Sequence, residues 1–210
     1  MSRSVDEMRR ALATLPGELP DAAAPALITL LAELARWSRK VNLTAIRDPD
    51  EMVTHHVLDS LAVRPLLEGR RILDVGTGPG FPGLPLAIAE PDREFTLIDS
   101  NQKKIAFVEH AVRTLGLENV KAVKARGEDY APGHRFDTVI ARALAALPRL
   151  LEIAGHHVGE GGVFVALKGR YPAEELEAVP APWSHEVKEI DVPGLAKGSR
   201  HAVLMRRRRQ

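Results

Sequence analysis

The sequence has no cysteine among its 210 residues. This absence excludes disulfide bonds, zinc sites built from thiolates, iron–sulfur clusters and every mechanism that uses a cysteine nucleophile. A chain without cysteine is compatible with a reducing compartment. Residues 1–7 contain two acids and no apolar run, unlike a secretory signal. We therefore expect a cytoplasmic protein.

Long apolar runs and aromatic residues are also scarce. No stretch approaches the roughly 18 uninterrupted apolar residues that a membrane-spanning helix needs. Phe, Trp and Tyr make up only 4% of the chain. So few rings exclude a large base-stacking platform of the kind that single-strand-binding proteins use. We expect a soluble globular protein with no membrane partner.

An excess of one charge sign is missing as well. Lys and Arg number 29 against 28 Asp and Glu, which gives a formal net charge of +1. Four of the bases are consecutive near the C-terminus: Arg206, Arg207, Arg208 and Arg209. Without them the body of the chain is mildly acidic. This balance excludes binding to nucleic acid or membrane through bulk charge alone, because such affinity scales with the phosphates neutralised.

Residues 1–64 are predicted to form a helical N-terminal extension. One apolar stripe at helical spacing consists of Leu27, Leu30, Leu31 and Leu34. A later helix is expected to begin at Asp48, whose carboxylate can cap it, with Pro49 at the first helical position. Its apolar stripe comprises Val53, Val57, Leu58 and Leu61.

From residue 70 short apolar runs alternate with helical patterns. Strands are predicted over 71–75, 94–98, 120–123, 136–141 and 162–167, and helices near 82–89, 102–115 and 145–154. Such alternation is typical of βαβ units and of a parallel sheet covered on both faces. Segments 187–192 and 201–205 are expected to pair as an antiparallel hairpin. The expected fold is α/β, with a doubly wound, mostly parallel, seven-stranded sheet that ends in this hairpin.

Residues 72–83 read Ile-Leu-Asp-Val-Gly-Thr-Gly-Pro-Gly-Phe-Pro-Gly, a glycine-rich loop between a predicted strand and a predicted helix. An open α/β sheet binds nucleotides at this position, because glycines let the backbone turn sharply and approach a ligand. Gly78, Gly80 and Gly83 also fit the G-x-G-x-x-G spacing of dinucleotide-binding loops. A dinucleotide-dependent oxidoreductase therefore remains an alternative, as does a tight turn that binds nothing.

Acidic residues and a proline near the loop bear on which class of ligand it could bind. Asp74 adds negative charge beside the loop and Pro82 lacks an N–H that a phosphate would use, which favours a cationic or zwitterionic ligand. Asp99 ends the second predicted strand, where a carboxylate can accept both ribose hydroxyls or cap the next helix. Gly127 and Glu128 follow the third, where they can read an adenine edge or form a solvated turn. Together they describe a nucleoside pocket without phosphates, which S-adenosylmethionine fits.

Absences also limit the group that could accept a methyl. Without cysteine the chain cannot attack a pyrimidine ring covalently, and it has no Asn-Pro-Pro or Asp-Pro-Pro signature of exocyclic-amine methylation. Arg142 follows the fourth predicted strand instead; it cannot act as a base, but it can bind a phosphate or the O6/N7 edge of guanine. A ring nitrogen with a free lone pair needs no base. Positioning would then supply the catalysis, so we expect no catalytic base and no metal.

Five segments together resemble the RsmG/GidB family: Asn42-Leu43-Thr44, His56-Val57-Leu58-Asp59-Ser60, residues 73–83, Ile140-Ala141-Arg142-Ala143 and Ala166-Leu167-Lys168-Gly169. The resemblance runs from about residue 31 to the last predicted strand. It implies a Rossmann-like class I methyltransferase fold, with residues 65–210 as the S-adenosylmethionine-binding domain. The implied reaction methylates N7 of one guanine in the decoding-region loop of 16S rRNA, either naked or within a 30S ribosomal particle.

The resemblance also assigns residues. Gly76 and Phe81 match the family's cofactor loop, Gly127 and Glu128 the adenine-side pair, and Arg142 the arginine that closes the site. The expected cofactor-binding residues are Gly76, Gly78, Phe81, Asp99, Gly127, Glu128 and Arg142. Arg142 and Lys168 are expected to hold RNA, since Lys168 follows the fifth predicted strand at the edge that carries the glycine loop.

Other basic groups have simpler interpretations. The pairs His55-His56 and His156-His157 are interpreted as surface residues rather than metal ligands, because adjacent side chains project in different directions. Relatives often carry arginine at the position of His55, so an RNA contact there would be weaker and pH-dependent. The arginine tail is either a solubilising end or a contact with rRNA phosphates. We expect a monomer; a non-catalytic RNA-binding or assembly protein that kept the pocket is a third alternative.

Overall fold

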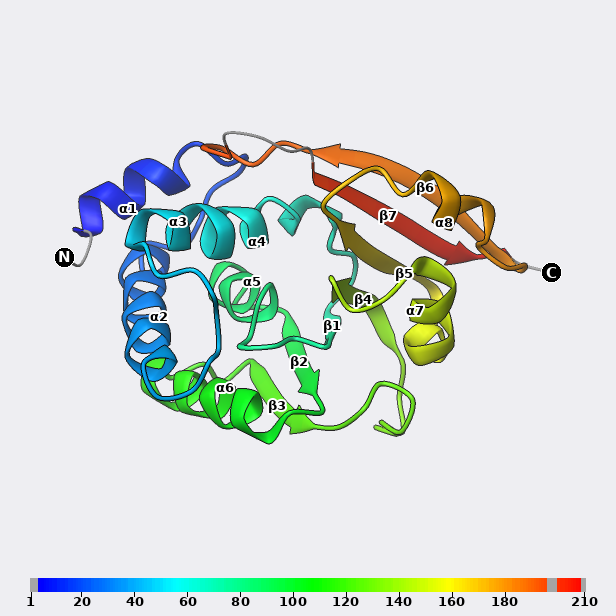
Figure 1. Ribbon diagram of the computed structural model, residues 1–210, viewed down its shortest axis with the longest axis horizontal. Coiled ribbons are helices and arrows are strands. Elements are labelled where there is room, and N and C mark those ends of the chain that lie inside the picture. Colours follow the sequence, from blue (N-terminus) through cyan, green and yellow to red (C-terminus); the bar gives the residue numbers. More distant parts are fainter. Residues whose placement is uncertain (1–3, 196–199, 209–210) are drawn as a thin grey trace.

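The protein is described by a computed structural model that covers residues 4–195 and 200–208. Its strands form one sheet in the order β3-β2-β1-β4-β5-β7-β6 (Figure 1). All neighbours are parallel except β5–β7 and β6–β7, which are antiparallel. The strands are β1 (Arg71–Val75), β2 (Glu94–Asp99), β3 (Val120–Lys124), β4 (Phe136–Arg142), β5 (Val158–Lys168), β6 (Trp183–Ile190) and β7 (Arg200–Arg207). This confirms the predicted seven-stranded sheet and its terminal hairpin.

Both faces of the sheet are buried, because helices cover both. Neighbouring residues on one strand enter two different apolar clusters: Ile72 and Ile140 belong to one, and Leu73 and Val139 to the other. Figure 1 shows α2, α4, α5 and α6 on one side and α7 and α8 on the other. These helices are α2 (Ala23–Ser38), α4 (Asp59–Leu61), α5 (Gly83–Ala89), α6 (Gln102–Leu115), α7 (Leu147–Ala154) and α8 (Ala173–Glu177). Continuous apolar strands are what a doubly covered parallel sheet requires.

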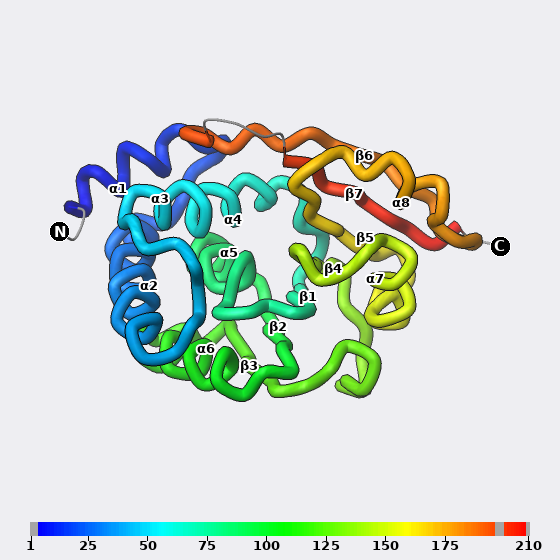
Figure 2. The backbone as a smooth tube through the Cα atoms, in the orientation of Figure 1, coloured from blue at the N-terminus to red at the C-terminus, as the bar shows by residue number. Residues whose placement is uncertain are grey.

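The predicted leucine stripe explains how the N-terminal helices attach. Leu27, Leu30 and Leu34 of α2 are fully buried in the cluster that contains Leu84 of α5 and Phe107 of α6. Helix α1 (Val5–Leu12) extends this cluster, and it lies at the opposite end of the longest axis from the end of β7 (Figure 2). Among the described residues no helix is long and apolar enough to cross a bilayer.

The helix predicted to start at Asp48 begins there, but it does not continue as an α-helix. The Asp48 carboxylate accepts hydrogen bonds from the N–H groups of Asp50 (2.8 Å) and Glu51 (3.0 Å), ahead of α3 (Pro49–Met52). A π-helical turn, η1 (Val53–Leu58), follows, and the Asp59 N–H donates to the Thr54 carbonyl five residues earlier. A 3₁₀ turn, η2 (Arg64–Leu66), then leads to β1. π-Turns inside helices often mark functional sites.

Two strands, β5 and β6, differ most from their predicted bounds. β5 begins at Val158 rather than at 162, because a second register with Phe136 of β4 extends it before an irregularity. β6 spans Trp183–Ile190 rather than 187–192, since it pairs with β7 as far as Arg207. A 3₁₀ turn, η3 (Gly155–His157), joins α7 to β5.

Candidate functional site

The sheet order reverses between β1 and β4, because β2 and β3 extend from β1 in one direction and β4 and β5 in the other. Ligands of open α/β sheets bind at such a point, outside the carboxyl ends of the strands. Two cavities lie there. The first, of about 320 Å³, is called the β1–β3 cavity, and its lining includes Gly76, Asp99, Gly127, Glu128 and Leu144. The second, of about 350 Å³, is called the β4–β7 cavity, and its lining includes His56, Asp59, Arg142, Lys168 and Arg200.

The β1–β3 cavity brings together four of the predicted cofactor residues. Gly76 follows β1, Asp99 ends β2, and Gly127 and Glu128 follow β3. The parallel register of these strands carries their carboxyl ends to one edge of the sheet. Convergence of these strand ends, predicted from their order along the chain, is therefore present in the structure.

The glycine loop uses all of its backbone donors within the protein. Between residues 76 and 84 the N–H donors are Gly76, Thr77, Gly78, Gly80, Phe81, Gly83 and Leu84, and each donates to a protein oxygen at 2.7–3.0 Å. The other two residues of this stretch are prolines, which have no N–H. A pyrophosphate would therefore find no spare backbone donor in this described loop, and that argues against the dinucleotide interpretation.

Asp74 supports the loop from below. Its side chain is fully buried, and its Oδ2 accepts hydrogen bonds from the Thr77 hydroxyl (2.6 Å) and the Gly83 N–H (2.9 Å). Burial raises the pKa of this carboxyl to about 6, while the two hydrogen bonds act in the opposite direction. Its Oδ1 has no partner within the described part of the chain. Asp74 lines neither cavity, so its negative charge beneath the loop favours a cationic ligand over an anionic one without direct contact.

Asp99 shapes the same loop from the end of β2. Its Oδ2 accepts the Gly78 N–H (2.9 Å) and its Oδ1 accepts the Asn101 N–H (2.8 Å), with the Lys104 ammonium 3.8 Å away. The alternative that Asp99 caps the next helix is wrong. Asn101 is the cap of α6, and its side-chain oxygen accepts the N–H groups at the start of that helix. Asp99 therefore lines the cavity with its carboxylate fixed by backbone donors.

Gly127 and Glu128 form the far wall of the cavity. The Gly127 carbonyl accepts a hydrogen bond from Nε2 of His157 (2.8 Å), and a Cβ at Gly127 would come within 2.5 Å of Ile153. Burial lowers the pKa of His157, against the effect of the Gly127 hydrogen bond, so the ring is a neutral Nε2–H donor at neutral pH. Glu128 pairs with Arg149 (2.9 Å) and stays partly exposed. The backbone at Gly127 can therefore lie at the cavity wall only because this residue has no side chain.

Three predicted cofactor residues do not line the β1–β3 cavity. Gly78 turns within the loop, and Arg142 lies in the other cavity. Phe81 is buried, with its ring packed on His56 at a centroid distance of 4.8 Å. The structure therefore makes Phe81 a contact between the glycine loop and the β4–β7 cavity.

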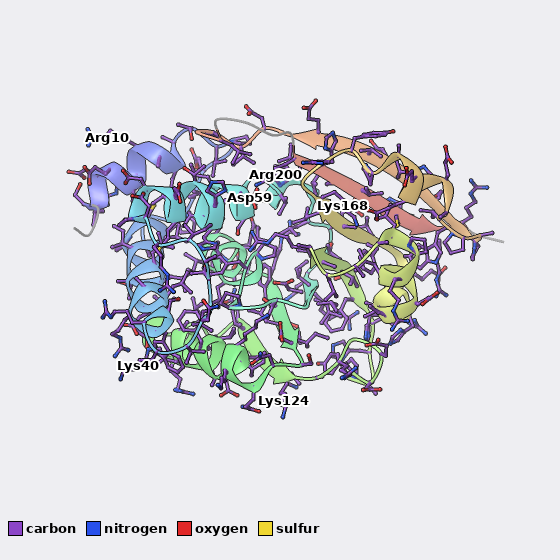
Figure 3. The ribbon with its side chains drawn as sticks, viewed as in Figure 1. Arg10, Lys40, Asp59, Lys124, Lys168 and Arg200 are labelled. Atoms are coloured by element: carbon purple, nitrogen blue, oxygen red, sulfur yellow. The ribbon has the colours of Figure 1, made fainter. Side chains whose placement is uncertain are left out.

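One carboxylate in the β4–β7 cavity holds two guanidinium groups. Asp59 Oδ2 accepts from Nη1 of Arg142 (3.0 Å), and its Oδ1 accepts from Nε of Arg200 (2.7 Å). Asp59 is buried, and Figure 3 shows it beside Arg200 with Lys168 close by. Each arginine keeps further N–H donors after this contact. The ionised lining is net positive, since Arg142, Lys168 and Arg200 outweigh Asp59.

Lys168 lines the same cavity but its ammonium is already engaged. Nζ donates to the Ala145 carbonyl (2.9 Å) and to the Glu175 carboxylate (2.6 Å), and the side chain is only 13% exposed. An anion at this position would therefore compete with Glu175 for the lysine.

His56 and His157 are not surface residues, so that interpretation is wrong for one member of each pair. The π-turn and its neighbours bury every residue from His56 to Leu61, which an amphipathic helix on an open surface would not do. Nε2 of His56 lies 2.9 Å from the Thr44 hydroxyl. Burial, followed by the charge of Arg142, lowers the pKa of His56 to about 4. Across the described chain, no three potential ligands gather into a metal site.

The arginine tail is not a free end as far as it is described. Arg206 and Arg207 belong to β7; Arg206 pairs with Glu68, and the Arg207 guanidinium lies 5.2 Å from the Trp183 ring centroid. These contacts are at the opposite end of β7 from Arg200 and the cavity. Arg209 lies outside the described residues.

Sequence reasoning did not select several residues of the β4–β7 cavity: His56, Asp59, Arg200 and His201. His56 was interpreted as a surface residue, and Asp59 stood only in a segment that carries the family resemblance. Arg200 lies 141 residues from Asp59, and no local pattern connects the two.

Comparison with known proteins agrees with this geometry. The family model described as GidB, rRNA small subunit methyltransferase G, matches residues 23–203. A ribosomal RNA small subunit methyltransferase G from Idiomarina loihiensis is 50% identical over 182 residues, covering 86% of this chain and 88% of that protein. One of the same name from Stenotrophomonas maltophilia is 49% identical over 188 residues, covering 89% and 88%.

Solved structures agree on the fold. A SAM-dependent O-methyltransferase from Thermotoga maritima superposes with a TM-score of 0.57 at 18% identity, over 86% of this chain and 72% of that one. A ribosomal protein L11 methylase from Lactobacillus delbrueckii gives 0.56 at 16% identity, over 77% and 80%. The chain therefore has a Rossmann-like methyltransferase fold, and it belongs to the GidB family of small-subunit rRNA methyltransferases.

Proposed function

We propose that this enzyme transfers a methyl group from S-adenosylmethionine to N7 of one guanine in 16S rRNA. The observation that carries the proposal is the pair of cavities on either side of the switch point between β1 and β4. One suits a nucleoside without phosphates, and the other is positively charged. Family membership adds the ribosomal substrate.

The β1–β3 cavity is the proposed seat of S-adenosylmethionine, which supplies a methyl group on a sulfonium when bound. Asp99 would hold the ribose, and Gly127 with Glu128 would contact the adenine. Gly76 would let the loop approach the cofactor, since a side chain there would meet Leu144 at 2.9 Å. The negative charge of Asp74 and the self-bonded loop that contains Gly78 and Phe81 fit a cationic ligand without phosphates.

The β4–β7 cavity is the proposed seat of the target nucleotide. Arg142 and Arg200 would bind phosphate or base acceptors with the N–H groups that Asp59 leaves free, and Lys168 would add a third cation. The N7 lone pair would form a bond to the methyl carbon as the carbon–sulfur bond of the donor breaks and S-adenosylhomocysteine leaves, so the reaction would need neither a catalytic base nor a metal. Positive charge moves to guanine in this step, and the Asp59 carboxylate lies in the cavity that receives it.

We further propose the division into residues 1–64 as a helical extension and 65–210 as the catalytic domain. The enzyme would act as a monomer in the cytoplasm, where small-subunit rRNA is assembled. Its substrate would be naked 16S rRNA or the 30S particle.

Two measurements test the function. Calorimetry should detect binding of S-adenosylhomocysteine and no binding of NAD(H); the reverse result would contradict a methyltransferase. Incubation with S-adenosylmethionine and undermethylated 16S rRNA or 30S particles should yield 7-methylguanosine by nucleoside mass spectrometry. Cofactor binding without a modified nucleoside would favour an assembly protein.

Arg142→Ala should reduce methylation more than cofactor affinity, and unchanged turnover would remove Arg142 from the site.

A further inference from the structure

Two buried histidines with an unpaired ring nitrogen line the β4–β7 cavity. His56 is 7% exposed and His201 is 9% exposed, and both line the cavity. Nδ1 of each ring has no hydrogen-bond partner in residues 4–195 or 200–208. Buried polar atoms are almost always paired in folded proteins. Two buried and unpaired nitrogens on residues that line one charged cavity therefore indicate that it receives a polar ligand.

The hydrogen bonds of Thr44 determine which nitrogen of His56 carries the proton. The Thr44 hydroxyl oxygen accepts the Ile46 N–H (3.2 Å) and lies 2.9 Å from Nε2 of His56. If Nε2 donated to this oxygen, the hydroxyl proton would have no acceptor among the described contacts of Thr44. If the hydroxyl donates to Nε2, the Thr44 proton, the Ile46 N–H and Nε2 are all paired, and only Nδ1 is left without a partner. Nε2 is then the acceptor, and the ring proton must reside on Nδ1.

The surroundings keep the His56 ring neutral, so its single proton decides which nitrogen donates and which accepts. Burial disfavours the charged ring, and the neighbouring charges of Arg142 and His55 act in the same direction, against Asp59. The pKa of His56 is therefore held at about 4. At neutral pH His56 is a hydrogen-bond donor at Nδ1 with an occupied acceptor at Nε2.

His56 connects the β4–β7 cavity to the glycine loop. Its ring packs on Phe81 of the glycine loop. Arg142 and Ala143 line the β4–β7 cavity, and the next residue, Leu144, lines the β1–β3 cavity. A base that entered beside His56 would thus be close to the proposed cofactor seat.

We propose that His56 is a specificity-determining residue that donates its Nδ1–H to O6 of the target guanine, with Thr44 fixing the required tautomer. The inference rests on the proposed function and identifies the residue that would recognise the target base at that site. A donor on O6 leaves the lone pair of N7 free to react. Adenine carries an amino group in place of O6, so the same N–H would face another donor and the buried pair would be unsatisfied.

The tautomer can be measured without substrate. Protein labelled with ¹⁵N at histidine should show His56 protonated at Nδ1 in nitrogen-detected NMR spectra. Thr44→Ser keeps the hydroxyl and should preserve this state, whereas Thr44→Val should release it and mix the tautomers. A wild-type ring protonated at Nε2, or a Thr44→Val spectrum identical to wild type, would overturn the assignment by Thr44.

The contact is tested with 30S particles whose 16S rRNA carries either guanine or 2-aminopurine at the target position, introduced by splinted ligation. 2-Aminopurine retains N7 and lacks O6. With guanine, His56→Phe should lower kcat/KM about 10- to 100-fold, while its rate on 2-aminopurine should match that of wild type. His56→Asn, which retains an N–H near the position of Nδ1, should recover part of the loss.

A loss by His56→Phe of the same factor on both bases would indicate a structural role and overturn the proposal, as would no loss on either. S-adenosylhomocysteine affinity should stay within about threefold in each variant, and His185→Phe, at an exposed histidine of β6, should behave as wild type. Failure of the proposed function looks different: wild-type enzyme would bind the cofactor and methylate no guanine, while the NMR result would stand on its own.

Discussion

The two cavities are built in opposite ways, although they share one edge of one sheet. The β1–β3 cavity is formed by three strand ends that follow one another along the chain, and backbone hydrogen bonds fix its glycine loop. The β4–β7 cavity collects charged side chains from α4, β4, β5 and β7, which are far apart in sequence. One is a rigid cradle made of main chain, and the other is a set of side chains held together by Asp59.

This difference teaches how the two proposed ligands would be recognised. A cradle of main chain tolerates very few substitutions, because a side chain at most of its glycines would meet a neighbour: Gly76, Gly80, Gly83 and Gly127. Side chains that are paired with one another can exchange partners when an anionic ligand arrives. Four predictions test this contrast between the two cavities.

The largest effect is expected from Gly83→Val on the β1–β3 side. A Cβ at Gly83 would overlap Leu97 and lie 2.8 Å from Asp74 Oδ2, so the loop must shift. Calorimetry should show S-adenosylhomocysteine affinity at least 100-fold lower, and denaturant unfolding should show a loss of about 2–4 kcal/mol. Gly161→Ala is the control: its φ is +74° with open space around it, so backbone strain should cost about 1 kcal/mol and leave affinity unchanged. Normal cofactor binding by Gly83→Val would show that the cradle is not rigid.

Asp59→Asn tests the paired charged side chains of the β4–β7 cavity. The variant keeps the shape but removes the charge that holds Arg142 and Arg200 together. Methylation should fall about 30-fold, in keeping with a lost buried charge pair, while S-adenosylhomocysteine affinity stays within about threefold. Glu152→Gln, in an exposed ion pair with Arg149, should change neither quantity. Equal losses of cofactor affinity and methylation would mean that the cavities do not act separately.

A buried titratable group on each side should give opposite pH dependences of stability. The pKa of Asp74 is raised from 3.8 to about 6, so its stabilising contribution is present below pH 3.8 and is lost as the pH rises through 6. The pKa of His56 is lowered from 6.5 to about 4, so its contribution is present above pH 6.5 and is lost as the pH falls through 4.

The corresponding variants should remove these slopes. Each shift amounts to about 3 kcal/mol across its window. Asp74→Asn should flatten the free energy of unfolding between pH 4 and 6, relative to wild type, and His56→Phe should flatten it between pH 6.5 and 4. Denaturant titrations over this range measure both, and parallel wild-type and variant curves would contradict the assigned shifts.

The smallest effect is expected from Glu128→Gln. This carboxylate is partly exposed and paired with the exposed Arg149, and such pairs contribute little. If Glu128 contacts adenine as proposed, S-adenosylhomocysteine affinity should fall about threefold with no change in the melting temperature. A 100-fold loss of S-adenosylhomocysteine affinity would make Glu128 as important as the glycine loop and would contradict the contrast between backbone and side chains.

The contrast also explains what the sequence could predict. β1 and α6 have the predicted bounds, because apolar runs and helical periodicity are local signals. The β1–β3 residues were found for the same reason, since each stands directly after a predicted strand. Nothing local identifies Arg200 as a partner of Asp59, because only the antiparallel hairpin brings β7 beside β5.

The π-turn illustrates a second limit. The spacing of Val53, Val57 and Leu61 is equally compatible with a regular α-helix, so the wider turn leaves no signature in apolar periodicity. Burial of His56 was missed because it depends on contacts with Phe81 and Thr44, which belong to other segments. Likewise, Arg206 looked like part of a charged tail until its strand pairing and its contact with Glu68 were known.

The glycine loop, whose N–H groups all bind within the protein, has a consequence for competition between the cofactor and other nucleotides. Cells are rich in nucleotides that carry the same adenosine group attached to phosphates, and each of them could compete for a pocket shaped to a nucleoside. A loop whose N–H groups are all occupied offers such competitors no compensation for the water their phosphates would lose. The main chain of the loop thus disfavours phosphate-bearing competitors, in addition to the negative charges of Asp99 and Glu128 in the cavity lining.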